Sequence, residues 1–299
     1  MGIIDDRLAV IQPVSKFWYG NKVAALDMLR LDLLHPVVSG NKWFKLRLNM
    51  KYAVESGFKA IVTSGGGWSN HLAATAFAAK HFGIRAIGIV RGKYDVLTPT
   101  LEACKADGME LIFVSQEDYK NRHEPQWAST LVEHFDEVFI IPEGGANEWG
   151  RKGAGLIGRF INDSYTHIVL AVGTGTMLIG LRNQLDIQQQ VLGFVPMKQG
   201  AYLKENISEH LLNGKNANWE LFDEWHFGGF GKWNKELLAF MNDFYTENKM
   251  PLDIVYTSKM MYGLREMLYG SHFSSHERIL CIHSGGLQGN VSVKDELVW

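Results

Sequence analysis

Short apolar runs bounded by glycine alternate with longer helical stretches along most of this 299-residue chain. The runs are rich in β-branched residues, and the segments between them are too long for hairpin turns. The strand-like runs are "AIVTSGG", "IRAIGIV", "MELIFVS", "EVFIIPEGG" and "HIVLAVGTGT". This alternation predicts an α/β fold in which helices cover a parallel sheet. A glycine-rich segment at 141–155 is the expected domain joint, and the pattern resumes after it, which predicts a second open, mostly parallel sheet.

Composition and charge narrow the class of ligand. The chain is 46% hydrophobic and 21% charged, with a net charge of -2 and no long basic run. These values argue against nucleic acid or an anionic membrane as the main partner, so a small molecule is expected. The first residues, "MGIIDDRLAV", lack the basic and apolar regions of a signal peptide, which favours the cytoplasm. Cys104 and Cys281 lie in apolar or helical contexts and are expected to be buried and reduced.

A lysine stands where a helix is expected to begin. In "VVSGNKWFKLRLNM", turn residues precede Lys42, and the apolar residues after it recur at helical spacing. A cation is unfavourable at a helix N-terminus, because the unpaired amide hydrogens there carry partial positive charge. A pocket at that place would lower the pKa of Lys42 and favour its nucleophilic form. An ordinary surface lysine after a turn is the alternative.

Two glycine-rich turns follow strand-like runs and precede helical ones. In the first, Ser69, Asn70 and His71 open an alanine-rich helix, and such a start can bind a carboxylate. The alternative is that Ser69 or Asn70 only caps the helix. The second turn is suited to a phosphate, although a tight packing turn would look similar. Its four residues are Gly173, Thr174, Gly175 and Thr176.

A third turn lies near the end of the sequence, where Ser284 emerges from a strand-like run. Tyr256 and Thr257 precede it in "LDIVYTSKMMYGL". Two residues of these stretches have structural alternatives. Tyr256 could be a core aromatic residue, and His283, just before Ser284, could be a strand residue whose hydrogen bonds are satisfied. His272 and His276 are spaced to share a helix face, but no third ligand with motif spacing accompanies them, so no metal site is predicted.

These parts together suit pyridoxal phosphate, which needs a nucleophilic lysine, a phosphate loop and a residue at the pyridine nitrogen. The motifs resemble the aminocyclopropane-carboxylate deaminase and D-cysteine desulfhydrase family of pyridoxal phosphate enzymes. The likeness runs in order from about Leu29 to Asn290. It is carried by "SGNKWFKL", "SGGGWSNHLAA", "IPEGGANEWG", "AVGTGT", "VYTSKMMYGL" and "IHSGGLQG".

The resemblance implies a tryptophan-synthase-β-like fold in a homodimeric enzyme. A larger domain of 1–45 with 151–299 would hold the cofactor, and 46–150 would form a smaller inserted α/β domain. Lys42 would be the lysine that binds the cofactor covalently, and Asn70 would contact its phenolic oxygen. The loop 173–176 would hold the phosphate, and Ser284 would face the pyridine nitrogen. Phe44 departs from the family, which has arginine there, and "GTGTM" departs from "GTGGT".

The resemblance also assigns substrate contacts. Ser69, Asn70 and His71 would lie at the substrate carboxylate, with Ser69 moving protons, and Tyr256 and Thr257 at its reacting end. Ring-opening members carry glutamate and leucine where this chain has Thr257 and Ser284. Those two positions favour β-elimination from a D-amino acid such as D-cysteine.

Two other kinds of function stay open from the sequence. One is an aminocyclopropane-carboxylate deaminase, or another deaminase or racemase that uses the same cofactor. The other is a non-catalytic protein that binds pyridoxal phosphate or an amino acid.

Overall fold

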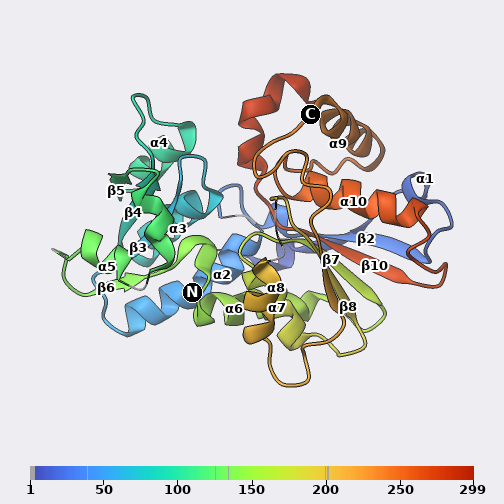
Figure 1. Cartoon of the computed structure of the whole chain (residues 1–299), viewed down its shortest axis with the longest axis horizontal. Helices are drawn as coiled ribbons and strands as arrows, with labels where there is room; N and C mark the ends of the chain where they lie inside the picture. Colours follow the sequence, from blue (N-terminus) through green and yellow to red (C-terminus); the bar gives the residue numbers. More distant parts are fainter. Residues whose placement is uncertain (1–3, 39, 125, 134, 199, 201) are drawn as a thin grey trace. The chain divides into compact units, whose positions relative to one another are not determined.

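The computed structural model describes residues 4–38, 40–124, 126–133, 135–198, 200 and 202–299. The chain forms two compact units, one of Lys42–Gly153 and the other of Ile4–Asn41 with Ala154–Trp299 (Figure 1). The sequence predicts 46–150 for the smaller domain and 1–45 with 151–299 for the larger. In the structure the first break falls just before Lys42, and the second falls inside the glycine-rich segment 141–155.

The smaller unit is built on a four-stranded sheet of order β5-β4-β3-β6, in which every pair is parallel. Both faces of this sheet are covered, so its central strands β3 and β4 are buried over consecutive residues rather than at alternate ones. The strands are β3 (Ala60–Gly66), β4 (Arg85–Arg91), β5 (Met109–Val114) and β6 (Val138–Ile140).

Helices of the smaller unit follow the periodicity of their apolar residues. In α3 the run of alanines on the buried side lets the helix backbone lie close to β3 and β4. The helices are α2 (Asn41–Glu55), α3 (Asn70–Phe82), α4 (Pro99–Ala106), α5 (Trp127–Leu131) and α6 (Glu148–Gly155). Two 3-10 turns join them, η3 (Asp118–His123) and η4 (Glu143–Gly145).

The larger unit holds a six-stranded sheet of order β1-β2-β10-β7-β8-β9. Only the edge strand β1 runs antiparallel, against β2, and the other pairs are parallel. The strands are β1 (Val10–Pro13), β2 (Ala25–Arg30), β7 (His167–Ala171), β8 (Gln190–Phe194), β9 (Trp219–Phe222) and β10 (Arg278–His283). The predicted fold class, with two mostly parallel sheets, is confirmed.

Helices lie on both faces of the larger sheet, and α9 and α10 cover the face opposite α7 and α8 (Figure 1). The helices are α1 (Lys16–Tyr19), α7 (Thr176–Gln184), α8 (Tyr202–Glu209), α9 (Lys235–Asn248) and α10 (Thr257–Tyr269). Four 3-10 segments complete this unit: η1 (Asp6–Leu8), η2 (Leu31–Leu34), η5 (Leu156–Phe160) and η6 (Leu287–Glu296). Leu280, Cys281 and Ile282 are consecutive and fully buried, as expected for a strand covered on both faces.

Both cysteines are buried free thiols, as predicted. Burial raises the pKa of Cys104 to about 12 and that of Cys281 beyond its ordinary range. Neither thiol is therefore poised to act as a nucleophile. None of the helices among the described residues has the length and apolarity that a membrane crossing needs.

Candidate active site

The turn after β3 leads directly into α3, and Ser69 is its N-cap. The Ser69 Oγ atom accepts a hydrogen bond of 3.2 Å from the Leu72 N–H, so Ser69 caps α3. Gly65 has no room for a side chain, because a Cβ atom there would lie 2.6 Å from Ser69 Oγ. The capping bond uses a lone pair of the hydroxyl and leaves its proton for another acceptor.

His71 has a tautomer that its neighbours determine. Thr63 Oγ1 donates its single proton to the Ile141 carbonyl at 2.7 Å, so the 2.9 Å contact with His71 Nε2 requires that nitrogen to be the donor. His71 Nδ1 is then an acceptor, and it is buried with no hydrogen-bond partner among the described residues. Burial, followed by the charges of Lys42 and Lys45, lowers the pKa of His71 to about 3.

This tautomer limits the role that the resemblance gives to His71. A carboxylate needs a donor, and the His71 ring has its only proton directed at Thr63. A contact between this residue and a substrate carboxylate would therefore use the backbone N–H at the start of α3. Asn70 Oδ1 is likewise buried without a described partner, so this helix start presents two unused acceptors.

Lys42 lies in the first turn of α2, as predicted, and is half-buried. Lys45, which the sequence reasoning missed, lies one turn further along and is buried. Burial, and then the charge of Lys42, places the pKa of Lys45 well below its usual value. A Cβ atom at Gly145 would lie 3.2 Å from Lys45 Cβ and 3.9 Å from His71 Cε1, so these side chains meet at that glycine. Phe44, where the family has arginine, is fully buried and serves the core.

The glycine-rich loop 173–176 connects β7 to the N-terminus of α7, as predicted. Gly175 adopts the left-handed conformation with φ of +79°, and a Cβ atom there would lie 2.9 Å from Ile207 Cγ1. The Thr174 and Thr176 hydroxyls lie 2.8 Å apart. A glycine turn that presents hydroxyls and the free N–H groups of a helix start suits a phosphate.

Tyr256 lies beside this loop. A Cβ atom at Gly173 would be 3.6 Å from the Tyr256 hydroxyl, so the structure brings the predicted phosphate loop and the predicted tyrosine together. Tyr256 also caps α10 by its position, and its backbone N–H donates to Asp253 Oδ1 at 2.8 Å.

Thr257 is fully buried and bonded to Asp253. Its hydroxyl donates to Asp253 Oδ2 at 2.7 Å and accepts from the Asp253 N–H at 2.8 Å. The Asp253 carboxylate also accepts from the backbone N–H groups of Val255, Tyr256 and Thr257. It is thus occupied by four donors at the start of α10 and is poorly placed to act as a base.

Ser284 follows β10 as predicted, and its surroundings fix its backbone. Its carbonyl accepts from the Asn41 N–H at 3.2 Å. A Cβ atom at Gly40, which has φ of +62°, would lie 1.8 Å from the same carbonyl oxygen, so this turn requires glycine.

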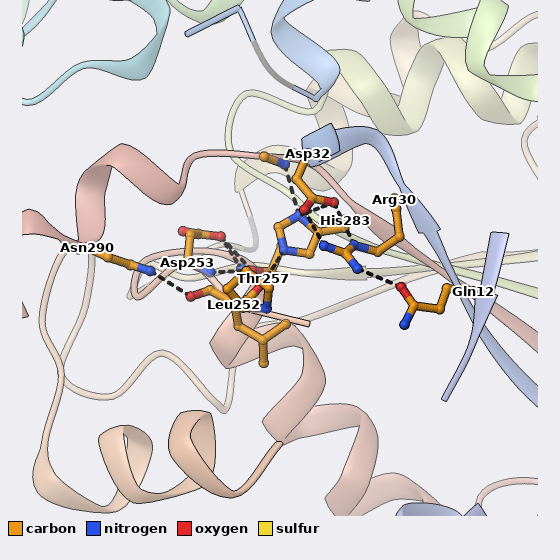
Figure 2. Close-up of polar contacts among 10 residues, drawn as sticks. Gln12, Arg30, Asp32, Leu252, Asp253, Thr257, His283 and Asn290 are labelled. Atoms are coloured by element: carbon orange, nitrogen blue, oxygen red, sulfur yellow. Dashed lines mark hydrogen bonds and ion pairs between the residues drawn. The ribbon is translucent and has the colours of Figure 1, made fainter. Parts of the chain in front are cut away.

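Figure 2 shows a buried polar network around His283, the residue that precedes Ser284 in the sequence. His283 Nε2 contacts the Pro251 carbonyl at 2.7 Å, and its Nδ1 lies 3.4 Å from Asp32 Oδ1. Asp32 accepts two hydrogen bonds from Arg30, whose third contact is Gln12. The structural alternative for His283, a satisfied strand residue, is therefore confirmed. Through the Pro251 contact, His283 connects the end of β10 to the segment that carries Tyr256.

Asn290 supports the same segment from η6. Its side-chain amide donates to the Leu252 carbonyl at 2.9 Å and accepts from the Ile254 N–H at 2.9 Å (Figure 2). Sequence reasoning missed Asp32, Asp253 and Asn290. Asp253 and Asn290 bond mainly to backbone groups, and the burial of the Asp32 pair with Arg30 is a tertiary property.

The predicted helix for His272 and His276 is wrong. The helix α10 ends at Tyr269 with Gly270 as its C-cap, and both histidines lie in the turns that follow. His272 packs against aromatic rings, including Phe273 at 5.1 Å. Across the described ranges, no three His, Cys, Asp or Glu side chains gather closely enough to hold a metal ion.

Comparison with known proteins gives the family. The family model described as "Pyridoxal-phosphate dependent enzyme" matches residues 27–285. This chain belongs to the pyridoxal-phosphate dependent enzymes. Its curated relatives include proteins named as putative aminocyclopropane-carboxylate deaminases and as D-cysteine desulfhydrases.

Two curated relatives and one solved structure illustrate this. The "Putative 1-aminocyclopropane-1-carboxylate deaminase" of Pyrococcus horikoshii is 30% identical, over 90% of this chain and 86% of that protein. The D-cysteine desulfhydrase of Serratia proteamaculans is 26% identical, over 86% of this chain and 85% of that protein. The crystal structure of an "ACC deaminase homologue" has a TM-score of 0.85 at 26% identity, covering 97% of this chain and 93% of that one.

The residues present fit the family's cofactor, pyridoxal phosphate. The loop 173–176 has the conformation and hydroxyls that a phosphate needs, and the orphaned Asn70 Oδ1 needs a donor. Lys42 and Lys45 lie in the first turns of α2, and the side chains of Lys45 and His71 meet at Gly145. The bound cofactor would withdraw electrons from the substrate amino acid at its α-carbon.

Proposed function

We propose that this pyridoxal-phosphate dependent enzyme catalyses β-elimination from a small D-amino acid, with D-cysteine as the first candidate. The overall reaction converts D-cysteine and water to pyruvate, ammonia and hydrogen sulfide. Cleavage of the Cβ–S bond follows loss of the α-proton, and water then releases the amino group as ammonia. A homodimer and a cytoplasmic location stay predictions.

The observation that carries the proposal is the environment of Thr257. Ring-opening relatives, by the resemblance above, have glutamate at this position, whereas here a threonine hydroxyl is bonded to Asp253. Asp253 cannot replace that glutamate, because four donors already occupy its carboxylate. A ring-opening reaction would therefore lack the carboxylate expected beside Tyr256.

Each proposed site residue has a task that its local structure supports. Lys42 would hold the cofactor and, once free, take the α-proton of the substrate. Ser69 keeps a hydroxyl proton after capping α3, so it can donate to the substrate carboxylate. Tyr256 would lie at the leaving sulfur, and Ser284 would bond the pyridine nitrogen as a neutral partner. The loop 173–176 would anchor the phosphate, and the Asn70 side chain would contact the phenolic oxygen.

Aminocyclopropane-carboxylate deamination is the second candidate. The relative from Pyrococcus horikoshii carries that name at 30% identity, against 26% for the D-cysteine desulfhydrase. Both identities are low enough for the reaction to differ within the family. A non-catalytic cofactor-binding protein is the third candidate, and the buried hydrogen bonds of His71 and Thr257 weigh against it.

A substrate panel separates the three candidates. The purified holoprotein should release pyruvate from D-cysteine and from β-chloro-D-alanine, and little 2-oxobutyrate from aminocyclopropane-carboxylate. Both products are measured by coupled lactate or hydroxybutyrate dehydrogenase assays, with the L-amino acids as controls. Faster formation of 2-oxobutyrate would establish the second candidate instead. A yellow protein that converts no compound in the panel would support the third.

Substitution of Thr257 and Ser284 tests whether these two residues make β-elimination preferred over ring opening. The double change Thr257→Glu with Ser284→Leu should lower pyruvate formation by about 100-fold or more, on the scale of a lost acid–base or positioning group. It should shift the product ratio toward 2-oxobutyrate. Thr257→Ser is the matched control, because serine keeps both hydrogen bonds to Asp253. Full elimination activity in the double variant would show that these two positions do not set the reaction.

A further inference from the structure

Lys259 lies one helical turn after Tyr256 on α10, and it has no task in the reaction proposed above. Its side chain is buried, with 2% of the residue exposed. The ammonium donates to the His226 carbonyl at 2.8 Å, the Gly229 carbonyl at 2.9 Å and the Pro196 carbonyl at 3.4 Å. Three backbone carbonyls around one buried ammonium form an arrangement that a surface lysine does not have.

Two of these carbonyls belong to the loop 226–231, whose backbone is unusual. Phe227, Gly228, Gly229 and Gly231 all have positive φ, and the value at Gly229 is +122°, which favours glycine. A chain with so many left-handed residues needs external contacts to hold one conformation. Lys259 supplies the polar contacts, and Tyr262, also on α10, packs edge-on against Phe227 at 4.9 Å.

The tip of this loop lies against Tyr256. Phe230 is 55% exposed, and its ring centroid is 5.9 Å from that of Tyr256 in a T-shaped arrangement. Tyr256 in turn lies against Gly173 of the phosphate loop. The position of the loop 226–231 therefore determines what covers the Tyr256 ring.

We propose that Lys259 is a positioning residue that clamps the loop 226–231 onto α10 and so sets the affinity of the enzyme for the substrate side chain at Tyr256. The use of D-cysteine as the substrate in the kinetic test of this proposal rests on the proposed function. The clamp itself is a property of the loop and can be measured without turnover.

The number of donors on Lys259 gives the clamp a pH dependence. Burial lowers the pKa of Lys259 to about 8, and Asp253 partly opposes this shift. The ammonium has three donors for three carbonyls, whereas the neutral amine has two, so one carbonyl loses its partner above that pH. Other charged or titratable groups near the loop are Glu224, His226 and Lys232 in sequence, Lys198, which packs beside Gly229, and Tyr262, which packs against Phe227.

Limited trypsin digestion reports the loop directly, because Lys232 is exposed just after it. Lys259→Met should increase cleavage after Lys232 by about fivefold or more, since charge-assisted hydrogen bonds are the strong ones. The fragment ending at Lys232 is identified by mass spectrometry. Lys22→Met is the matched control, because Lys22 contacts Tyr269 at the far end of the same helix and is exposed.

Kinetics and pH then separate a positioning role from a general loss of structure. Lys259→Met should raise KM for D-cysteine about fivefold or more and leave kcat within about twofold. Between pH 7 and 9, cleavage after Lys232 should rise more in the wild type than in Lys259→Arg, whose guanidinium stays charged. If Lys259→Met does not fold, the pH comparison of the wild type with Lys259→Arg still tests the role of Lys259. The KM of Phe230→Ala, which should also rise about fivefold or more, then tests the link to substrate affinity.

The proposal is overturned by wild-type cleavage after Lys232 in a folded Lys259→Met protein, or by equal pH responses of the wild type and Lys259→Arg. An unchanged KM in Phe230→Ala would refute the link between the loop and substrate affinity. Because digestion needs no turnover, the clamp is tested even where the wild type releases no pyruvate from D-cysteine. A failure of the proposed function is thus distinguishable from a failure of the clamp.

Discussion

Lys42→Ala protein is expected to lose the visible absorption of covalently bound cofactor and at least about 1,000-fold of its turnover, because one residue both holds the cofactor and moves the α-proton. The structure places Lys42 in the first turn of α2, one turn before the buried Lys45, whose side chain meets that of His71 at Gly145. Absorption spectra and pyruvate release measure the two effects.

Lys45 is the physical rival for the same task, since its pKa is lowered by burial. Borohydride reduction of the wild type, followed by peptide mass spectrometry, should place the cofactor on Lys42. Modification of Lys45, or a Lys42→Ala protein that keeps the absorption, would contradict the assignment. Lys51→Ala is the control from the same helix, because Lys51 is exposed and pairs only loosely with Glu55 at 3.8 Å.

The contrast between Lys42 and Lys45 explains how much of the site the sequence could predict. Motif order located Lys42, Ser69, Tyr256 and Ser284, because each follows a strand or opens a helix in the structure as well. The tautomer of His71 could not be predicted, since it depends on Thr63 and on a carbonyl that lies 78 residues beyond Thr63. The burial of Lys45 is likewise a tertiary property, although its three-residue spacing from Lys42 was a usable signal.

The fold, like the site, has features that local sequence predicts and features that depend on tertiary contacts. Glycine-bounded, β-branched runs predicted β3, β4, β5, β6, β7 and β10 near their observed positions. The strands β1, β2, β8 and β9 were not predicted. In β2, "ALDMLR" is made largely of good helix formers. Pairing with β1 on one side and β10 on the other determines its conformation. Tertiary pairing overrides local propensity in this way for central strands.

Asp32→Ala is expected to lower the free energy of unfolding by about 3–5 kcal/mol, because it leaves the buried Arg30 guanidinium without its carboxylate. The pair is nearly dry, with side-chain exposures of 5% for Arg30 and 2% for Asp32. Gln12 would remain as a neutral partner of Arg30 at 2.7 Å and could not balance its charge. A thermal midpoint lower by roughly 10 °C is the measurable result.

The same chain contains a matched control for this prediction. Arg7 and Asp5 are also two residues apart and make the same paired contacts, from Nε at 2.8 Å and from the terminal nitrogen at 2.7 Å, but they lie at the surface. Asp5→Ala should leave the thermal midpoint almost unchanged, because exposed ion pairs contribute little. Arg30→Met in the Asp32→Ala background should recover part of the loss, since no unpaired charge then stays buried. Equal midpoints for Asp32→Ala and Asp5→Ala would mean that burial of the Arg30 pair does not govern its contribution, and that the network around His283 is not a stabilising support of the site.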